Sequence, residues 1–493
     1  MYNLSAIKNL AKQTVVYGLS TILGRFFNYL LVPLYTRVFT DVEYGISSEF
    51  YAYMAFFNIL LTHGMETAFF RFAQQDNSKQ IFANAMVSIM GIAGAFMLTI
   101  LLFGNNIAQF IGYGLNPEFI FYSAGILFLD SLSAIPFALL RFQNKALRFA
   151  IIKNINIFSL IAFNLYLLVL GPFWHKQFGS LIPFYQQGMG IESVFMANLA
   201  ASFLTLVLLG KEIISVGFSF NYGQWRQMIV YAVPMIWVGL AGMVNETLDR
   251  LLIRLLSSNP EEGKALNGIY SANYKFSIII TLFIQAFKFA AEPFFFAHAK
   301  TTEKRDLYAT VMNYFIWICL FVFLMVMFFL HYFKIFIGTR FHEGLNVVPI
   351  LLFANIFLGI YYNVSIWYKL SDNTKKGAQI SLIGAIVTIV LNVIFIPKFG
   401  YLACAWTTFI CYFIMMVLGY LWGQKYYPIP YNLSRALLYV STALTLFALV
   451  QGSMFWIEAN SFLGNIIRVF SLLIFVFIAY FKERKLVAQL VKL

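Results

Sequence analysis

Fourteen apolar stretches limit what this chain of 493 residues can fold into. Each runs for about 20 residues without alternation, which is the length that an α-helix needs to cross about 30 Å of hydrocarbon. Transmembrane strands would instead need alternating apolar and polar side chains. The sequence therefore predicts an all-α integral membrane protein, with helices near residues 14–36, 46–70, 80–104, 117–141, 149–171, 191–213, 228–256, 268–295, 306–332, 346–369, 378–397, 400–423, 433–456 and 461–481.

The composition excludes the soluble classes of protein. Charged residues make up 11% of the chain and hydrophobic residues 61%, whereas a soluble domain carries about 25% charged residues. This leaves too little polar surface to cover a cytosolic enzyme or a secreted module. The three cysteines lie within apolar stretches and lack metal-ligand or redox spacing, so we expect buried core thiols at Cys319, Cys404 and Cys411.

The basic residues predict the orientation of the chain. Of the 34 Lys and Arg residues, 22 lie in one set of gaps between the expected helices, Arg141 and Lys153 among them, and six lie in the alternate set. Because basic residues near helix ends are retained on the cytoplasmic side, we expect both termini in the cytoplasm. This topology explains the net charge of +14 better than nucleic-acid binding does.

A faint internal repeat suggests two lobes. A Val-Tyr pair at 16–17, followed by Gly-Ile at 45–46, resembles Val-Tyr at 230–231 followed by Gly-Ile at 268–269. The two helix pairs start from the same face, as in a parallel repeat about an axis along the membrane normal. We expect an N-terminal lobe of six helices, a C-terminal lobe of six helices and an appended helix pair with its tail, at residues 1–215, 216–425 and 426–493.

Ionisable residues inside the expected helices are candidate functional groups, because each costs about 2.5 to 3.5 kcal/mol near the bilayer centre. Arg25 lies at the middle of the first helix, and Asp130 near the middle of the fourth. The two could form a buried ion pair, or Arg25 could face a cavity and contact substrate. The ion pair and the substrate contact are compatible if Asp130 neutralises Arg25 in the absence of substrate.

Three further groups of charges stand near helix ends. In the expected helix 228–256, Glu246 to Arg250 is a favourable spacing of four residues, and Arg250 to Arg254 continues the stripe beside Asp249. This group predicts a gate or a lobe contact. In the second helix, we expect Glu66 and Arg71 to pair at the cytoplasmic end.

The third group consists of Lys275 and Lys288, which are 13 residues apart in one expected helix. At about 100° per residue they lie some 220° apart around a straight helix. Both can face one cavity only if this helix is kinked or rotated.

No catalytic signature is present in the sequence. The 20 acidic residues and five histidines form no cluster at metal-ligand spacing, and there is no glycine-rich phosphate loop. We therefore expect neither an enzyme nor a cofactor, and coupling to a Na⁺ or H⁺ gradient stays open. A cationic interior suits an anionic or lipid-linked substrate.

Several segments of the chain resemble the polysaccharide repeat-unit flippases of the multidrug, oligosaccharidyl-lipid and polysaccharide exporter superfamily. The likeness is strongest over the first, second, seventh and eighth expected helices. The segments that carry it are Gly24–Thr36 with Glu43–Gly45, Gly64–Phe72, Asp249–Leu252 leading to Gly268–Lys275, and Gln285–Phe296.

The resemblance implies two lobes that alternate between inward and outward opening in a bacterial cytoplasmic membrane. The implied substrate is a polyprenyl-diphosphate-linked oligosaccharide, and the implied partners are membrane lipids and polysaccharide polymerase or other assembly proteins. Family members bind the diphosphate with cavity cations, a role that passes here to Arg25, Lys275 and Lys288. Lys288 stands where similar sequences lead us to expect Arg, which keeps the charge but loses bidentate phosphate geometry.

Other functions stay open at this point. Multidrug extruders and lipid II flippases share the fold, and fold alone does not settle substrate. A cation-coupled extruder would be favoured by an acidic cavity. A membrane-embedded polymerase or ligase would be expected to carry a sizeable loop outside the membrane, whereas the largest gap is about 20 residues, from Gly171 to Gly190.

Overall fold

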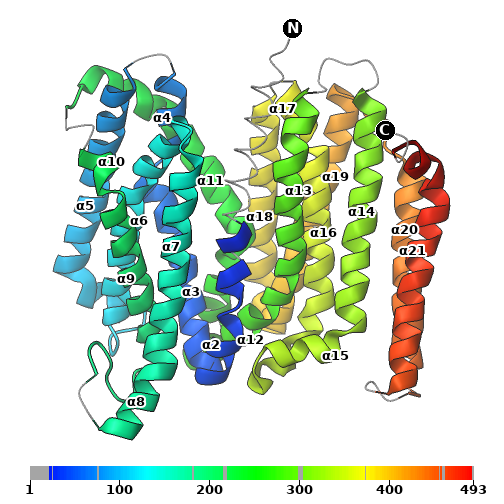
Figure 1. The fold of residues 1–493 in the computed structure, drawn as a ribbon, viewed down its shortest axis with the longest axis horizontal. Helices are drawn as coiled ribbons and strands as arrows, with labels where there is room; N and C mark the ends of the chain where they lie inside the picture. Colours follow the sequence, from blue (N-terminus) through cyan, green and yellow to red (C-terminus); the bar gives the residue numbers. More distant parts are fainter. Residues whose placement is uncertain are drawn as a thin grey trace. The chain divides into compact units, whose positions relative to one another are not determined.

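A computed structural model shows an all-helical chain (Figure 1), whose long helices form from the apolar stretches of the sequence. It describes residues 22–24, 26–74, 77–179, 182–214, 219–297, 304–371, 373–454, 456–457 and 461–490. Ten helices in the described residues are long and apolar enough to cross a membrane. The prediction of an all-α membrane protein is confirmed.

The chain forms two compact units, residues 1–268 and 269–493. In the first unit, α5 packs on α6, α9 packs on α6 and α7, and α3 packs on α6 and α11. The helices of this unit are α2 (Val32–Val38), α3 (Asp41–Thr62), α4 (Met65–Phe72), α5 (Ser78–Phe110), α6 (Glu118–Phe142), α7 (Ala146–Leu165), α8 (Gly171–Phe178), α9 (Glu192–Leu208), α10 (Gly210–Ile214), α11 (Tyr222–Leu256) and the start of α12 (Pro260–Tyr274).

The second unit is built around α16, which packs against α19, α14 and α13. Its α18 packs on α19, and α20 packs on α14 and α21. Its helices are α13 (Ile278–Ala297), α14 (Lys304–Phe328), α15 (Leu330–Phe333), α16 (Val348–Val364), α17 (Ile366–Leu370), α18 (Thr374–Phe399), α19 (Tyr401–Tyr426), α20 (Leu433–Ser453) and α21 (Phe462–Leu490).

The compact units divide the chain at a different place from the expected lobes. Helix α11 packs on α3, α4 and α5 of the first unit, although the repeat assigns its sequence to the start of the second lobe. The division at residues 215 and 425 stays a prediction about the transport cycle.

Two expected helices are interrupted in the structure. The stretch 46–70 ends as α3 at His63, which has a φ of 33°, and restarts as α4 after Gly64, which has a φ of 72°. The stretch 268–295 is broken by a 3₁₀ turn at Lys275–Ser277. Left-handed backbone at two successive residues cannot continue an α-helix, so α4 is free to leave the axis of α3.

One expected loop is helical. The stretch 149–171 continues through a π-turn at Tyr166–Leu170 into α8, which ends at Phe178. The sequence analysis placed a gap from Gly171 to Gly190, whereas the first eight residues of that gap form α8, with Pro172 in its first turn, where proline is well tolerated. The connection to α9 is correspondingly shorter than expected.

The topology can be tested at the start of α18, where Asn373 is exposed. In intact cells, Asn373→Cys is expected to resist an impermeant maleimide and to react after permeabilisation. Gln186→Cys, exposed on the α8–α9 connection that we assign to the opposite side, should react in both. The native cysteines are buried, so their background should be low. Labelling of Asn373→Cys in intact cells would reject the predicted orientation.

Candidate functional site

A polar cavity of about 500 Å³ lies inside the first unit. It is lined by residues of α3, α4, α6, α7 and α9, among them Asp130 at the middle of α6. Its lining residues are Asn58, Thr62, Glu66, Asp130, Ser133, Ala134, Phe137, Arg141, Phe149, Lys153, Asn156, Asn198, Ser202 and Thr205.

Helical spacing brings these side chains together. Apart from the adjacent Ser133 and Ala134, the lining residues follow one another at intervals of three or four on α6, α7 and α9, and residues so spaced share one face of an α-helix. The stripe on α9, for example, consists of Asn198, Ser202 and Thr205. The cavity is therefore formed where the polar stripes of several mostly apolar helices face each other.

One ion pair joins α4 to α6 at the cavity wall. Arg141 donates to Glu66, and the exposed fractions of the two side chains are 33% and 43%. The guanidinium of Arg141 also lies against Phe70, 5.0 Å from the ring centre, and 6.0 Å from that of Phe149. The ring contacts thus hold the guanidinium in place, and both side chains of the pair remain partly exposed.

This pair corrects the sequence analysis, which expected Glu66 to pair with Arg71. Arg71 instead lies over the ring of Tyr231, 4.2 Å from its centre, where its side chain is exposed. The two residues are five apart, and on a helix that spacing puts them on different faces. The gating or coupling role predicted for Glu66 and Arg71 stays a prediction.

The second cation and the second carboxylate of the cavity are not directly paired. The ammonium of Lys153 lies 4.2 Å from the ring centre of Phe137. Lys153 forms no ion pair within the described part of the chain. Asp130 accepts a hydrogen bond from Ser202, and Lys153 is the cation whose field acts on it. Arg25, the predicted partner of Asp130, lies outside the described residues.

Hydrogen bonds fix the neutral part of the lining. Asn156 donates to Thr205 at 2.8 Å and to the carbonyl of Ala201 at 3.2 Å, which ties α7 to α9. Asn198 donates to the hydroxyl of Tyr51 at 3.0 Å, which ties α9 to α3. The amide and hydroxyl groups therefore present defined donors and acceptors to the cavity.

The two other predicted cations lie in the second unit. Lys275 is half-buried and begins the 3₁₀ turn between α12 and α13. Lys288 is exposed on α13, with its ammonium 5.0 Å from the ring centre of Tyr362. The interruption at Lys275 is the break that both residues would need in order to face one cavity, and a shared cavity stays a prediction.

A buried charged cluster lies in the first unit at the other end of α3 from the polar cavity. Glu49 is fully buried and accepts from Arg254 Nε at 2.7 Å and from Tyr113 at 2.7 Å. Arg254 also donates to the carbonyl of Ile111 at 2.9 Å, and Tyr53 hydrogen-bonds to both charged groups. This Glu49–Arg254 cluster joins α3, α11 and the α5–α6 loop.

Tyr113 stays a hydrogen-bond donor in this cluster. Burial raises the pKa of Tyr113 well above its ordinary value, and the carboxylate of Glu49 raises it further. The tyrosine therefore remains protonated throughout the physiological range, and its ring also lies 4.7 Å from the ammonium of Lys264 on α12.

The sequence analysis identified Arg254 as part of a contact but gave it the wrong neighbours. The expected pair between Glu246 and Arg250 is not formed, because Glu246 is exposed and makes no ion pair in the described ranges. Asp249 is buried and accepts from the backbone N–H of Arg250. Gating by Glu246, Asp249 and Arg250 stays a prediction.

The two glycines of the sequence repeat meet beside this cluster. A Cβ on Gly45 would lie 1.8 Å from the carbonyl oxygen of Lys264, and one on Gly268 would lie 1.9 Å from that of Asp41. Asn267, which is fully buried, donates to the carbonyl of Gly45 at 2.9 Å. Helices α3 and α12 therefore touch backbone to backbone, which only glycine permits.

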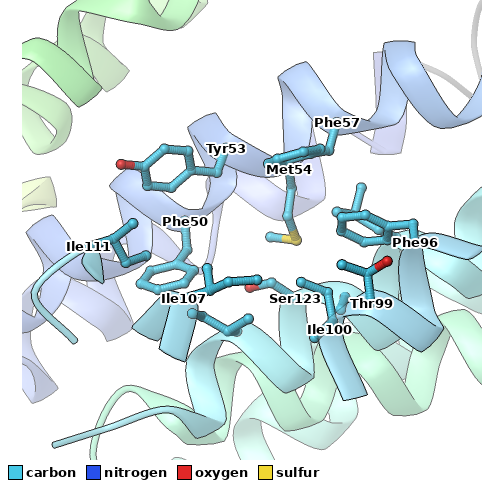
Figure 2. Close-up of a pocket in the computed structure, with 13 residues that line it drawn as sticks. Phe50, Tyr53, Met54, Phe57, Phe96, Thr99, Ile100, Ile107, Ile111 and Ser123 are labelled. Carbon is cyan, nitrogen blue, oxygen red and sulfur yellow. The ribbon is translucent and has the colours of Figure 1, made fainter. Parts of the chain in front are cut away.

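A separate apolar pocket of about 380 Å³ lies between α3, α5 and α6. Figure 2 shows Phe50 and Met54 extending from α3 toward Ile107 and Ile100 of α5. Its lining is aromatic and aliphatic apart from the hydroxyls of Tyr53, Thr99 and Ser123. This chemistry suits hydrocarbon, in contrast to the polar cavity near the other end of α3.

Comparison with known proteins shows the family that the sequence of this chain matches. Residues 10–298 match the family described as "Polysaccharide biosynthesis protein". The chain is 22% identical over 294 residues to "Lsg locus putative protein 1" of Haemophilus influenzae, covering 59% of this chain and 66% of that protein. The matched region thus spans slightly less than two thirds of that relative.

Solved structures share the fold across most of the chain. A structure of the lipid II flippase MurJ in an inward closed conformation superposes with a TM-score of 0.72 and 17% identity, covering 96% of this chain and 99% of MurJ. An inward-facing multidrug resistance transporter of the MATE family superposes with a TM-score of 0.57 and 15% identity, covering 85% of this chain and 93% of that one. A MATE structure in the straight conformation superposes with a TM-score of 0.60 and 11% identity, covering 85% of this chain and 95% of that one. The chain therefore belongs to the polysaccharide biosynthesis protein family and has the fold of MurJ and MATE.

Proposed function

We propose that this protein is a flippase that moves a polyprenyl-diphosphate-linked oligosaccharide across the bacterial cytoplasmic membrane by alternating access. The observation that carries the proposal is the charged polar cavity among the membrane-spanning helices of a chain in the polysaccharide biosynthesis family. A diphosphate and sugar hydroxyls cannot cross hydrocarbon without hydrogen-bond and charge partners, and the cavity supplies both.

The balance of charge in the cavity supports this substrate over a cationic drug. Two cations, Arg141 and Lys153, share the lining with two carboxylates, Glu66 and Asp130. A site for cationic compounds would be expected to carry net negative charge. Equal numbers do not give the cavity that charge, and its two cations remain available to an anionic group.

Further residues have proposed roles in the same cycle. Arg25, Lys275 and Lys288 are the proposed contacts for the diphosphate. Coupling or gating is the role proposed for Asp130, Glu66, Arg71, Glu246, Asp249, Arg250 and Arg254. The substrate partner is the lipid-linked glycan within its membrane lipids, and polysaccharide assembly proteins act on either side of this step.

The proposal predicts a specific defect on deletion of the gene. Cells lacking the protein should lose the surface polysaccharide and accumulate its lipid-linked repeat unit, because assembly continues while transfer stops. Lipid-linked intermediates are extracted and identified by mass spectrometry, with the plasmid-borne wild-type gene as the control. Accumulation of lipid II, or unchanged surface polysaccharide, would contradict the proposal.

Arg25 offers a residue-level test of the same function. Arg25→Ala should abolish export at normal protein levels, and Arg25→Lys should retain part of it, since removal of one charge-assisted contact weakens binding by roughly 10- to 100-fold. If Arg25 only neutralises Asp130, the double variant Arg25→Ala, Asp130→Ala should recover export, and full recovery would reject the contact with substrate.

A further inference from the structure

The cations of the polar cavity differ from ordinary structural ion pairs in how they are held. Lys153 rests on the ring of Phe137 rather than on a carboxylate. A cation over an aromatic face is stabilised without using its N–H donors, so the three donors of the ammonium remain available to a ligand. The side chain is only half-buried, which leaves it reachable.

Arg141 has donors to spare as well. Its hydrogen bond to Glu66 uses one terminal nitrogen and leaves the other, while its Nε is buried without a hydrogen-bond partner. A third of the side chain is exposed, and Phe70 and Phe149 set its position through ring contacts. The guanidinium can therefore exchange one carboxylate for another anion without losing its place.

Glu66 is suited to being displaced. Its side chain is 43% exposed and sits on the two-turn helix α4, which follows the left-handed residues His63 and Gly64. A partly exposed ion pair contributes little to stability, so an anionic ligand that also gains hydrogen bonds from the cavity can compete with it.

The remaining lining supplies the groups that recognise sugars. Asn156, Asn198 and Ser202 present amides and a hydroxyl, and Phe137 and Phe149 provide flat apolar walls. At about 500 Å³ the cavity has the size of a small-molecule site. It holds a part of an oligosaccharide rather than the whole.

We infer that this cavity binds an anionic oxygen group of the transported glycan together with an adjacent sugar, with Lys153 and Arg141 as donors and Glu66 as the internal counter-ion that the ligand displaces. The inference rests on the proposed function and adds a substrate site that the sequence did not indicate. The anionic group comes either from the diphosphate linkage or from an acidic sugar, and the chemistry of the site is the same for both.

Binding to the purified full-length protein in lipid nanodiscs tests the site. Farnesyl diphosphate and an oligosaccharide containing glucuronate are the two probes, with farnesol and a neutral oligosaccharide as uncharged controls. At least one of the two charged probes should bind more tightly than its own uncharged control. The probe that does so identifies the source of the anion, either the diphosphate or the acidic sugar. Binding of neither charged probe above its control would overturn the inference.

Three variants distinguish a ligand site from a structural ion pair. Lys153→Gln and Arg141→Gln should each weaken binding of the charged probe by about 10- to 100-fold. Glu66→Gln should strengthen binding, because the competing carboxylate is gone. If the pair is merely structural, Glu66→Gln should instead weaken binding of the charged probe, because losing either partner would then damage the cavity.

A matched control separates these effects from general loss of charge. Arg148 lies on α7, pairs with Glu212 at 2.6 Å and does not line the cavity, so Arg148→Gln should bind the probe as the wild type does. Lys153→Arg, which keeps the charge, should retain most binding and guards against misfolding in the glutamine variant. Equal affinity in all variants would reject the site.

Failure of this inference can be told from failure of the proposed function. If deletion blocks polysaccharide export but the cavity variants bind as wild type, only the assignment of the site is wrong. If the variants lose binding as expected but deletion leaves export intact, the site stands and the transported substrate is a different anion.

Discussion

Glu49→Ala is expected to destabilise the folded protein by about 3 to 5 kcal/mol, because it leaves the guanidinium of Arg254 buried without its carboxylate. Arg254→Ala should cost a similar amount for the converse reason. The midpoint of thermal unfolding is measured on the purified protein in detergent, with unfolding monitored as the loss of the monodisperse peak.

The matched control is the ion pair between Lys264 and Glu261 on α12, in which the Glu261 side chain is 66% exposed. Glu261→Ala should cost clearly less than Glu49→Ala, because the carboxylate of Glu261 is mostly in water and the buried ammonium of Lys264 keeps the ring of Tyr113 as a neighbour. Replacing both members of the buried pair by leucine should recover most of the stability, since hydrophobic replacement of a buried pair is often neutral. A Glu49→Ala variant as stable as Glu261→Ala would contradict the buried position of the pair.

Gly45→Ala is expected to have the second large effect, because its new Cβ would fall 1.8 Å from the carbonyl oxygen of Lys264. Backbone atoms must move to admit it, and forced overpacking costs at least about 1 to 3 kcal/mol. The unfolding midpoint in detergent should fall clearly below that of the wild type.

Gly91→Ala on α5 is the matched control, because a Cβ there meets nothing within 4 Å. Removing a glycine from a helix interior in open space should leave stability unchanged or raise it by about 0.5 to 1 kcal/mol. Equal unfolding midpoints for Gly45→Ala and Gly91→Ala would show that α3 and α12 do not touch.

The lengths of apolar stretches predicted the regular helices well. The expected helix at 117–141 is α6 at Glu118–Phe142, and the one at 400–423 is α19 at Tyr401–Tyr426. Where the backbone leaves the helix, hydropathy gives no warning, because His63 and Gly64 interrupt a stretch that remains apolar overall.

The polar cavity was missed because basic residues were interpreted only as topology signals. Counting Arg141 and Lys153 among the cytoplasmic gaps treats each as a residue at the membrane surface, but both lie on helices that face a cavity. A usable signal was present in the stripe of Asn198, Ser202 and Thr205, where polar residues recur at helical spacing in an apolar helix.

The partner of Arg254 was beyond the reach of any local pattern. Glu49 lies 205 positions away in the chain, whereas spacing rules compare residues three or four apart. Such rules favoured Glu246 and Arg250, which are four apart in sequence but form no ion pair with each other in the described part of the chain. Only the packing of α11 against α3 brings the true partners together.

The contact between Gly45 and Gly268 also determines how these two positions can change during evolution. Each absent side chain makes room for a main-chain carbonyl, which every amino acid carries, so no substitution in the facing helix can relieve a clash at either site. Side chains that touch can exchange sizes and therefore covary between homologues. Positions 45 and 268 should instead each remain glycine independently, and a contact map inferred from covariation would miss this backbone contact between α3 and α12.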